Sequence, residues 1–297
     1  MRHLLDIDDL SPLELAEILD LADWAQPPRA LDGAGVALIF EKASNRTRNA
    51  TEMAVFQLGG HPVSMRGDEV GVGTREPAGD VVRILAQYHS VVGARVADHA
   101  TLEAMAAVDC VPVVNLLSDR SHPCQAIADL LTLRRRWGDL RGRRLAWVGD
   151  GNNVARSLVL AAAMSGMDVA VANPAGYGLD PVTLDGARAL GATVRHTDSP
   201  RDAVAGADAV ATDVWVSMGQ DAEAAARRDA FGPYRVDAEL MSGAAEGAVF
   251  LHCLPARRGE EVAAEVIDGP SSLVWEEAAN RMHAARGLLL WLRGVRR

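Results

Sequence analysis

The sequence is poor in cysteine: its 297 residues include three, Cys110, Cys124 and Cys253. An odd number of widely scattered cysteines argues against a disulfide framework. It is typical of a protein that works in a reducing cytoplasm, which is the location we expect.

The chain also lacks long apolar runs and an excess of positive charge. No apolar segment is long enough to cross a bilayer, and acidic residues interrupt the N-terminal segment, so we expect neither a membrane span nor a signal peptide. The formal net charge is −10, and no long basic stripe offsets it, which argues against a nucleic-acid partner. The short run Arg134-Arg135-Arg136 is typical of a solvated helix face. The length suffices for two α/β domains, each with its own core.

What is present is an alternation of apolar strand patterns and helical patterns. The expected strands cover 36–40, 90–95, 111–116, 144–149, 168–173, 193–196, 209–212 and 248–254. Helical patterns lie between most of them, and a final amphipathic helix is expected over 272–293. The first helix opens with the capping box Ser11-Pro12-Leu13-Glu14. This alternation predicts an α/β fold of doubly wound parallel sheets, in which ligands bind beyond the carboxyl ends of the strands. Each polar cluster lies at such an end, so we expect one site between two domains.

The first polar cluster is Ser44-Asn45-Arg46-Thr47-Arg48, placed where strand 36–40 gives way to a helix. The free N–H groups and the positive end of a helix dipole favour an anion there. Adding Arg46 and Arg48 makes a site suited to phosphate. The alternative is an N-capping Ser44 followed by a solvated basic turn.

Three further donors, Arg95, His122 and Gln125, fall at the ends of other strand-like segments. Arg95 and His122 are suited to polarising a carbonyl group and to holding the oxyanion that develops on it. Taken singly, His122 could merely cap its helix and Arg95 could pair with a nearby acid. Together with the first cluster, they suit a phosphate that bears a polar carbonyl.

The second half carries the segments Gly149–Asn153, Asp213–Gly219 and His252–Pro255. A carboxylate, an amide, a hydroxyl and a thiol converge there, and they suit a substrate that carries an ammonium and an α-amino acid group.

Other chemistries are possible for the second half. The glycine-bearing turn resembles a dinucleotide fingerprint, but Val154 stands where the third glycine would fall and Asn173 replaces the expected acid. His252-Cys253 could suggest a metal, although no other His or Cys lies at ligand spacing. Cys253 could also be an acyl nucleophile, but no obvious base and orienting acid accompany it.

Four motifs in order resemble those of the ornithine carbamoyltransferases: Ser44–Arg48, His122-Pro123-Cys124-Gln125, Asp213 through Ser217-Met218-Gly219, and His252-Cys253-Leu254-Pro255. Asn280-Arg281 matches as well, and the resemblance spans nearly the whole chain. The first two motifs are shared with aspartate carbamoyltransferases, and the last two distinguish the ornithine branch. The resemblance implies transfer of the carbamoyl group of carbamoyl phosphate to the δ-amine of L-ornithine, giving citrulline and phosphate in arginine metabolism.

The resemblance also implies the site residues. Carbamoyl phosphate is expected to bind through Ser44, Asn45, Arg46, Thr47, Arg95, His122, Gln125 and Arg281. Ornithine is expected to contact Asn153, Asp213, Ser217 and Met218, with Cys253 and Leu254 at the reacting centre. Arg95, His122 and Cys253 are the expected catalytic residues, and neither a metal nor an organic cofactor is needed.

By the same resemblance, residues 1–135 and the C-terminal helix 279–297 form a carbamoyl phosphate-binding domain, and residues 136–278 form an ornithine-binding domain. The helix that begins at His122 joins the two. Members of the family are trimers, often further assembled, so the resemblance implies a homotrimer or a multiple of trimers. Two features depart from the family. Asn45 stands where threonine or a small residue is usual. The loop 68–77, from which family members lend a group to the active site of the neighbouring subunit, does not match the usual pattern, so none of its residues is assigned that role.

Three rival functions stay open. The closest is a carbamoyltransferase for another amine, such as putrescine, an acylated ornithine or aspartate. A dinucleotide-dependent oxidoreductase and a catalytically silent binding protein are more distant alternatives.

Overall fold

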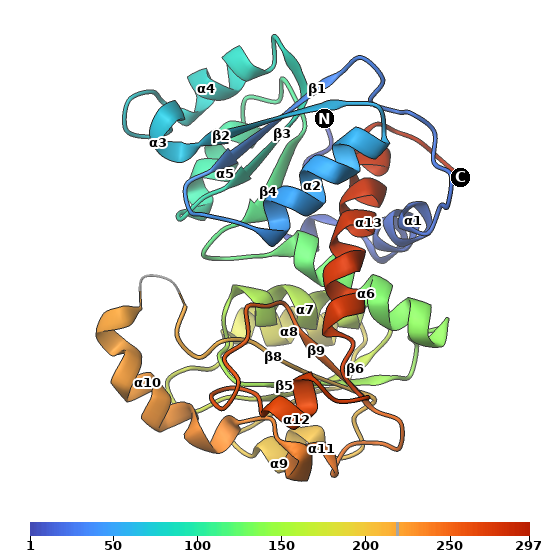
Figure 1. The fold of residues 1–297 in the computed structure, drawn as a ribbon, viewed down its shortest axis with the longest axis vertical. Coiled ribbons are helices and arrows are strands. Elements are labelled where there is room, and N and C mark those ends of the chain that lie inside the picture. Colours follow the sequence, from blue (N-terminus) through green and yellow to red (C-terminus); the bar gives the residue numbers. More distant parts are fainter. Residues whose placement is uncertain (218–219) are drawn as a thin grey trace. The chain divides into compact units, whose positions relative to one another are not determined.

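The computed structural model describes residues 1–217 and 220–297 and contains two compact units (Figure 1). Unit 1 comprises Met1–Leu131 and Ala279–Arg297, and unit 2 comprises Thr132–Ala278. The division falls within the helix α6 (Pro123–Trp137), and the domain boundary expected after residue 135 lies in the same helix.

Unit 1 is built on a four-stranded parallel sheet with the strand order β2-β1-β3-β4. Its strands are β1 (Gly35–Phe40), β2 (His61–Arg66), β3 (His89–Arg95) and β4 (Val113–Leu117). β1 is buried from Val36 to Phe40, because a continuous apolar run fills both faces of an inner strand.

Helices cover both faces of this sheet, with α4 and α5 on one side and α1, α2 and α13 on the other (Figure 1). The helical segments of unit 1 are η1 (Ile7–Asp9), α1 (Pro12–Ala22), α2 (Arg46–Gln57), α3 (Gly67–Val70), α4 (Ala78–Leu85), α5 (His99–Ala106), the first part of α6 and most of α13 (Val274–Leu292). The expected capping box of α1 is confirmed, since Ser11 accepts from the Glu14 N–H and the Glu14 carboxylate accepts from the Ser11 N–H.

The C-terminal helix α13 packs closely against α1 within unit 1. A Cβ added at Gly287 would stand 2.5 Å from the carbonyl oxygen of Ile18, so only glycine permits this approach. On the same helix the buried Arg286 donates hydrogen bonds to the carbonyl oxygens of Ala22 and Trp24. These contacts hold the end of the chain, including Arg281, in unit 1.

Unit 2 is built on a five-stranded parallel sheet with the order β7-β6-β5-β8-β9. Its strands are β5 (Arg144–Val148), β6 (Asp168–Ala172), β7 (Val194–Thr197), β8 (Ala209–Thr212) and β9 (Val249–His252). Its helical segments are α7 (Asn153–Met164), α8 (Pro181–Ala189), α9 (Pro200–Val204), η2 (Asp221–Glu223), α10 (Ala224–Phe231), η3 (Gly232–Tyr234), α11 (Ala238–Met241) and α12 (Ala264–Ile267). The predicted α/β class with two doubly wound parallel sheets is therefore confirmed.

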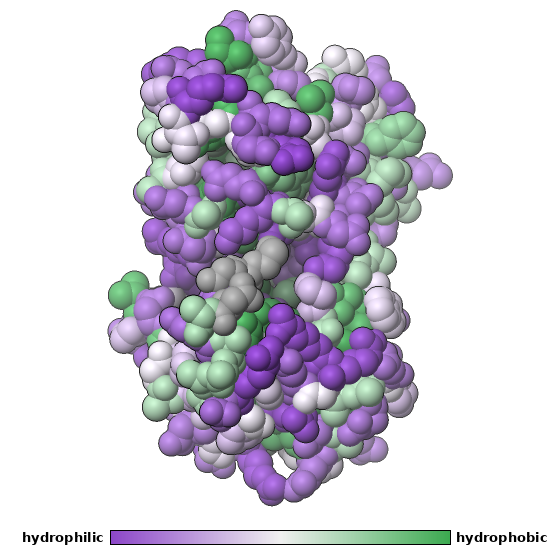
Figure 2. Space-filling model, turned by 60° about the vertical axis from the view of Figure 1, so that its left-hand side comes forward, coloured by the Kyte–Doolittle hydropathy of each residue, from purple (hydrophilic) through white to green (hydrophobic). Residues whose placement is uncertain are grey.

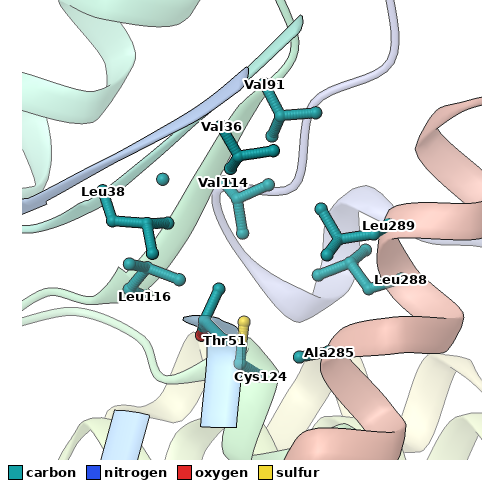
Figure 3. Close-up of a pocket in the computed structure, with 11 residues that line it drawn as sticks. Val36, Leu38, Thr51, Val91, Val114, Leu116, Cys124, Ala285, Leu288 and Leu289 are labelled. Carbon is teal, nitrogen blue, oxygen red and sulfur yellow. The ribbon is translucent and has the colours of Figure 1, made fainter. Parts of the chain in front are cut away.

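A small apolar cavity lies in unit 1 between the sheet and α13 (Figure 3). Leu288 and Leu289 point from α13 toward strand residues that include Val114 and Leu116. Thr51 and Cys124 complete one end of the lining, which contains no charged side chain. Because nothing charged lines it, the cavity is a void in the hydrophobic core and is unsuited to a phosphate.

On the face drawn in Figure 2, hydrophobic residues lie among hydrophilic ones. The large exposed hydrophobic side chains include Met53 and Phe56 on α2 and Ile84 on α4. In the described residues, none of the helices has both the length and the apolar character to cross a bilayer.

Candidate active site

In unit 1, polar side chains gather at the carboxyl ends of three neighbouring strands. Phe40 at the end of β1 is paired with Arg95 at the end of β3, and Arg95 is paired with Leu117 at the end of β4. Ser44 follows β1 and accepts a hydrogen bond from the Arg95 guanidinium at 3.2 Å. The sheet thus brings together two groups that lie 51 positions apart in sequence.

Arg281 of α13 connects two more of the expected residues. Its guanidinium donates to the Gln125 Oε1 at 2.5 Å and to the Thr47 hydroxyl at 2.6 Å, and all three side chains are buried. Gln125 in turn donates to the Asp129 carboxylate at 2.7 Å. A planar guanidinium that donates hydrogen bonds to two neighbouring side chains has a fixed orientation, and so has its positive charge.

His122 lies buried among positive charges. Burial lowers the pKa of its imidazole well below the usual value, and the charges of Arg281, Arg95 and Arg46 lower that pKa further. The imidazole is therefore neutral near pH 7, and three arginines act on one buried position. Such a place favours an anion or a polarised carbonyl oxygen.

The N-terminus of α2 contributes to the same cluster. The N-cap residue is Asn45, not Ser44, and its side chain makes no capping hydrogen bond to the helix. The first-turn N–H groups consequently keep their capacity to bind an anion. Arg48 is a different case from Arg46, because it forms an exposed ion pair with Glu52 one turn along the helix.

A buried network holds the segment that leads to His122. The Asn115 amide donates to the Leu5 carbonyl at 2.7 Å and to the Ser118 hydroxyl at 3.0 Å. The Ser121 hydroxyl donates to the Asp6 carboxylate at 2.7 Å. The start of α6 is therefore fixed by the N-terminal segment, and His122 with it.

Beside His122, burial raises the pKa of the Cys124 thiol to about 11. The thiol lies 3.4 Å from the Asn115 carbonyl and lines the apolar cavity, so it is a packing group and not a nucleophile.

In unit 2, a second polar cluster lies at the carboxyl ends of β5, β8 and β9. Asp213 follows β8 and is buried. Its carboxylate accepts from the Cys253 thiol at 3.2 Å and from the Asn152 amide at 2.8 Å. Asn152 also caps α7, accepting from the Val154 N–H at 3.0 Å, so the helix fixes the amide that orients Asp213.

The remaining expected residues of unit 2 lie around this cluster. Asn153 is the first residue of α7, Leu254 follows Cys253 directly, and Ser217 lies beyond β8, where its N–H donates to the Gln220 side chain. Met218 lies outside the described residues.

Arg227 of α10 is a functional candidate that the sequence did not reveal. It is buried, forms an ion pair with Asp150 and donates to the Trp215 carbonyl at 2.5 Å. The pKa of the Asp150 carboxyl group is raised to about 6. Burial is the largest cause, the Asp213 charge raises the pKa further, and the Arg227 charge partly offsets both. Arg227 thereby ties the segment after β8 to the turn after β5.

The glycine-bearing turn after β5 does not leave room for a dinucleotide. A Cβ on Gly151 would stand 2.4 Å from the backbone of Gly178 and of Leu179, so the chain itself covers the turn where a pyrophosphate would approach. Asn173, which replaces the expected acid, donates to the Gly149 carbonyl at 2.6 Å. The departure at Asn173 therefore has a structural role here.

Asp213, His252 and Cys253 lie close enough together to hold a metal ion, their ligand atoms falling within 4.8 Å of one another. The sequence pattern did not reveal this, because Asp213 joins the pair only through the fold. Both ring nitrogens of His252 already take part in hydrogen bonds, to Glu261 and to the Leu254 N–H, so His252 would have to give one up to bind a metal.

Arginines within and next to the loop 68–77 hold its backbone and side chains. Arg75 donates to the carbonyl oxygens of Glu69 and Val70, and Asp68 pairs with Arg66. Part of the segment expected as a loop is the short helix α3.

The fold and the two clusters define an α/β protein equipped for a small phosphorylated compound and for an amino acid. A family model described as "Aspartate/ornithine carbamoyltransferase, carbamoyl-P binding domain" matches residues 2–135, and one described as "Aspartate/ornithine carbamoyltransferase, Asp/Orn binding domain" matches residues 141–292. The chain belongs to the aspartate/ornithine carbamoyltransferase family.

Individual relatives agree with this assignment. The ornithine carbamoyltransferase of Acidothermus cellulolyticus is 48% identical over 98% of this chain and 96% of its own. The solved ornithine carbamoyltransferase from Pyrococcus furiosus is 42% identical with a TM-score of 0.94, covering 99% of this chain and 97% of that one. An N-acetyl-L-ornithine transcarbamylase K302R mutant is 29% identical with a TM-score of 0.89, covering 98% of this chain and all of that one.

Proposed function

We propose that the protein transfers the carbamoyl group of carbamoyl phosphate to the δ-amine of L-ornithine, giving L-citrulline and phosphate. The observation that carries this proposal is the convergence of Arg46, Arg95 and Arg281 on the buried, neutral His122 in unit 1. The ornithine carbamoyltransferases among the relatives support the choice of substrates.

Unit 1 is the carbamoyl phosphate-binding unit in this proposal. The phosphate is held by Ser44, Asn45, Arg46 and Thr47 with the N–H groups at the start of α2. The carbamoyl oxygen is polarised by Arg95 and His122, while Gln125 and Arg281 complete the site. A single preorganised donor to a developing oxyanion is worth about 3–4 kcal/mol in comparable sites.

Unit 2 is the ornithine-binding unit. Asn153, Ser217 and Met218 hold the α-amino acid group, and Asp213 attracts the side-chain ammonium. Cys253 and the Leu254 carbonyl orient the neutral amine once its proton is lost. A carboxylate alone favours the charged form of an amine, so Asp213 needs these partners.

The reaction then balances without an outside reagent. The amine nitrogen forms a bond to the carbamoyl carbon, and a tetrahedral oxyanion develops opposite Arg95 and His122. The bond from carbon to the phosphate oxygen breaks as the oxyanion collapses, and the departing phosphate collects the amine proton. No metal or organic cofactor takes part, so a chelator leaves the rate unchanged.

We further propose that the protein is a homotrimer, or a multiple of trimers, that works in the cytoplasm, in arginine biosynthesis. The resemblance to trimeric family members supports the assembly, and light scattering on the purified protein should give three times the mass of one chain or a multiple of that mass.

The test of the proposed function is a citrulline assay with carbamoyl phosphate and a panel of amines. L-ornithine should be carbamoylated with the highest kcat/KM, and N-acetyl-L-ornithine, putrescine and L-aspartate should react poorly or not at all. Faster turnover of one of those amines would reassign the substrate. No carbamoylated product from any of them would overturn the proposal.

A further inference from the structure

Directly behind the proposed reacting centre of unit 2 lies a buried pair that the mechanism leaves unused. The side chains of His252 and Glu261 are both fully inaccessible, and His252 Nε2 lies 3.1 Å from Glu261 Oε1. His252 is the last residue of β9, immediately before Cys253.

The hydrogen bonds fix the tautomer of His252. The Leu254 N–H donates to His252 Nδ1 at 2.9 Å, so Nδ1 is the acceptor. The ring proton therefore resides on Nε2, which donates it to the Glu261 carboxylate. Glu261 holds the imidazole in the one state that can accept from Leu254.

Glu261 is itself anchored at Oε1. Its Oε1 also accepts from the Arg257 N–H at 2.6 Å. Among the described residues, its buried Oε2 has no hydrogen-bond partner. Burying a carboxylate with one oxygen unsatisfied is unfavourable for stability, which argues that this acid serves something other than stability.

The backbone that this pair holds is unusual. Leu254 has φ 57°, in the left-handed region that a branched side chain rarely adopts. Such a conformation persists only where the surroundings enforce it. The His252 ring holds the Leu254 N–H from one side, and the Glu277 carboxylate accepts from the His252 N–H at 2.9 Å.

We propose that Glu261 and His252 are positioning residues for the amine. Glu261 orients His252, and His252 holds the Leu254 N–H so that the Cys253 thiol reaches Asp213 and the Leu254 carbonyl faces the amine. This inference rests on the proposed function, because the amine is that of ornithine.

The first test compares two substitutions of Glu261. Glu261→Gln keeps an acceptor for the His252 Nε2–H, so its kinetics should stay within about threefold of wild type. Glu261→Ala removes that acceptor and should lower kcat/KM for ornithine about 10–100-fold, the size of effect seen when a group that orients a metal-ligating histidine is lost. The KM for carbamoyl phosphate should not change in either variant. Glu260→Ala is the matched control, since Glu260 is the neighbouring acid and pairs with the exposed Arg228 and Arg257.

The second test separates the two faces of the His252 ring. His252→Asn places an oxygen near the position of Nδ1 and can still accept from Leu254, whereas His252→Gln reaches instead toward Glu261. The inference predicts that the Asn variant is the more active of the two. L-norvaline has the α-amino acid group of ornithine without its δ-amine, so we expect it to inhibit wild type and all these variants to the same extent.

The outcomes distinguish a positioning role from a merely structural one. The inference is wrong if Glu261→Ala lowers the melting temperature but keeps the wild-type KM for ornithine and the wild-type kcat per folded site. It is also wrong if norvaline binding falls in parallel with turnover. If wild type itself forms no citrulline, the proposed function fails first, and that result does not depend on any variant.

Discussion

At the scale of single residues, the most telling property of the protein is the charge state of His122. A histidine among three arginines cannot remain protonated when it is also buried, because both effects disfavour the imidazolium. A neutral imidazole still donates one hydrogen bond and can polarise a carbonyl without repelling the neighbouring guanidinium groups.

The same property predicts a dependence of stability on pH. The pKa of His122 is lower in the folded protein than in the unfolded chain, so below about pH 6.5 the unfolded state binds the extra proton. The free energy of unfolding should therefore fall as the pH falls below about 6.5, by about 1.4 kcal/mol per pH unit for this one group. Urea denaturation of wild type and His122→Gln between pH 5 and 7 measures it, and equal slopes in the two proteins would contradict the account.

Site residues that follow a strand pattern were predictable from the sequence. Residues that reach a site only through contacts between distant parts of the chain were not. Arg46, Thr47, Arg95, His122 and Gln125 were identifiable because each follows a strand pattern. Arg227 gave no signal, since it is one arginine in a helix and meets Asp150, 77 positions away, only through the fold. Asn152 was overlooked beside Asn153, although its place before a helical pattern marks it as an N-cap.

At the scale of elements, long apolar strands and strongly patterned helices were predictable from the sequence. The strand β2 was not, because it lies at the sheet edge and its half-buried residues lack a continuous apolar run. The short helices α5 and α9 to α12 were also missed, since four to eight residues carry too little periodicity. On α2, Met53 shares helical spacing with Ala54 and Leu58 but is exposed, because the buried side of α2 is centred on Thr51, Ala54 and Val55.

The turn after β5 gives a prediction at this scale. Gly151→Ala would force a Cβ against the backbone of Gly178 and Leu179 and displace Asn152 next to it. The variant should lose about 1–3 kcal/mol of unfolding free energy, and its KM for ornithine should rise with little change for carbamoyl phosphate. Gly232→Ala is the control, because a Cβ there meets no atom of the described residues within 4 Å. Denaturant titration and steady-state kinetics report both effects, and an unchanged Gly151→Ala protein would refute the packing argument.

At the scale of the whole molecule, the alternation of strand and helix was enough to predict two parallel α/β units. The placement of Arg281 in unit 1 was not predictable from periodicity, because it depends on α13 packing against α1 through Gly287. Only the resemblance to the carbamoyltransferases pointed to it. That one cleft serves both polar clusters stays a prediction.

In the proposed function, the cluster in unit 1 and the cluster in unit 2 serve one reaction, and each holds one substrate. Calorimetry with a stable bisubstrate analogue tests whether the two clusters act together. The analogue carries a phosphonate in place of the leaving phosphate, joined through an acyl linker to the δ-nitrogen of ornithine. We expect wild type to bind the analogue far more tightly than the phosphonate fragment or norvaline alone. Arg281→Lys in unit 1 and Asp213→Asn in unit 2 should each weaken that binding. An analogue that binds no more tightly than its phosphonate fragment, or a variant of either cluster that leaves its affinity unchanged, would contradict the claim.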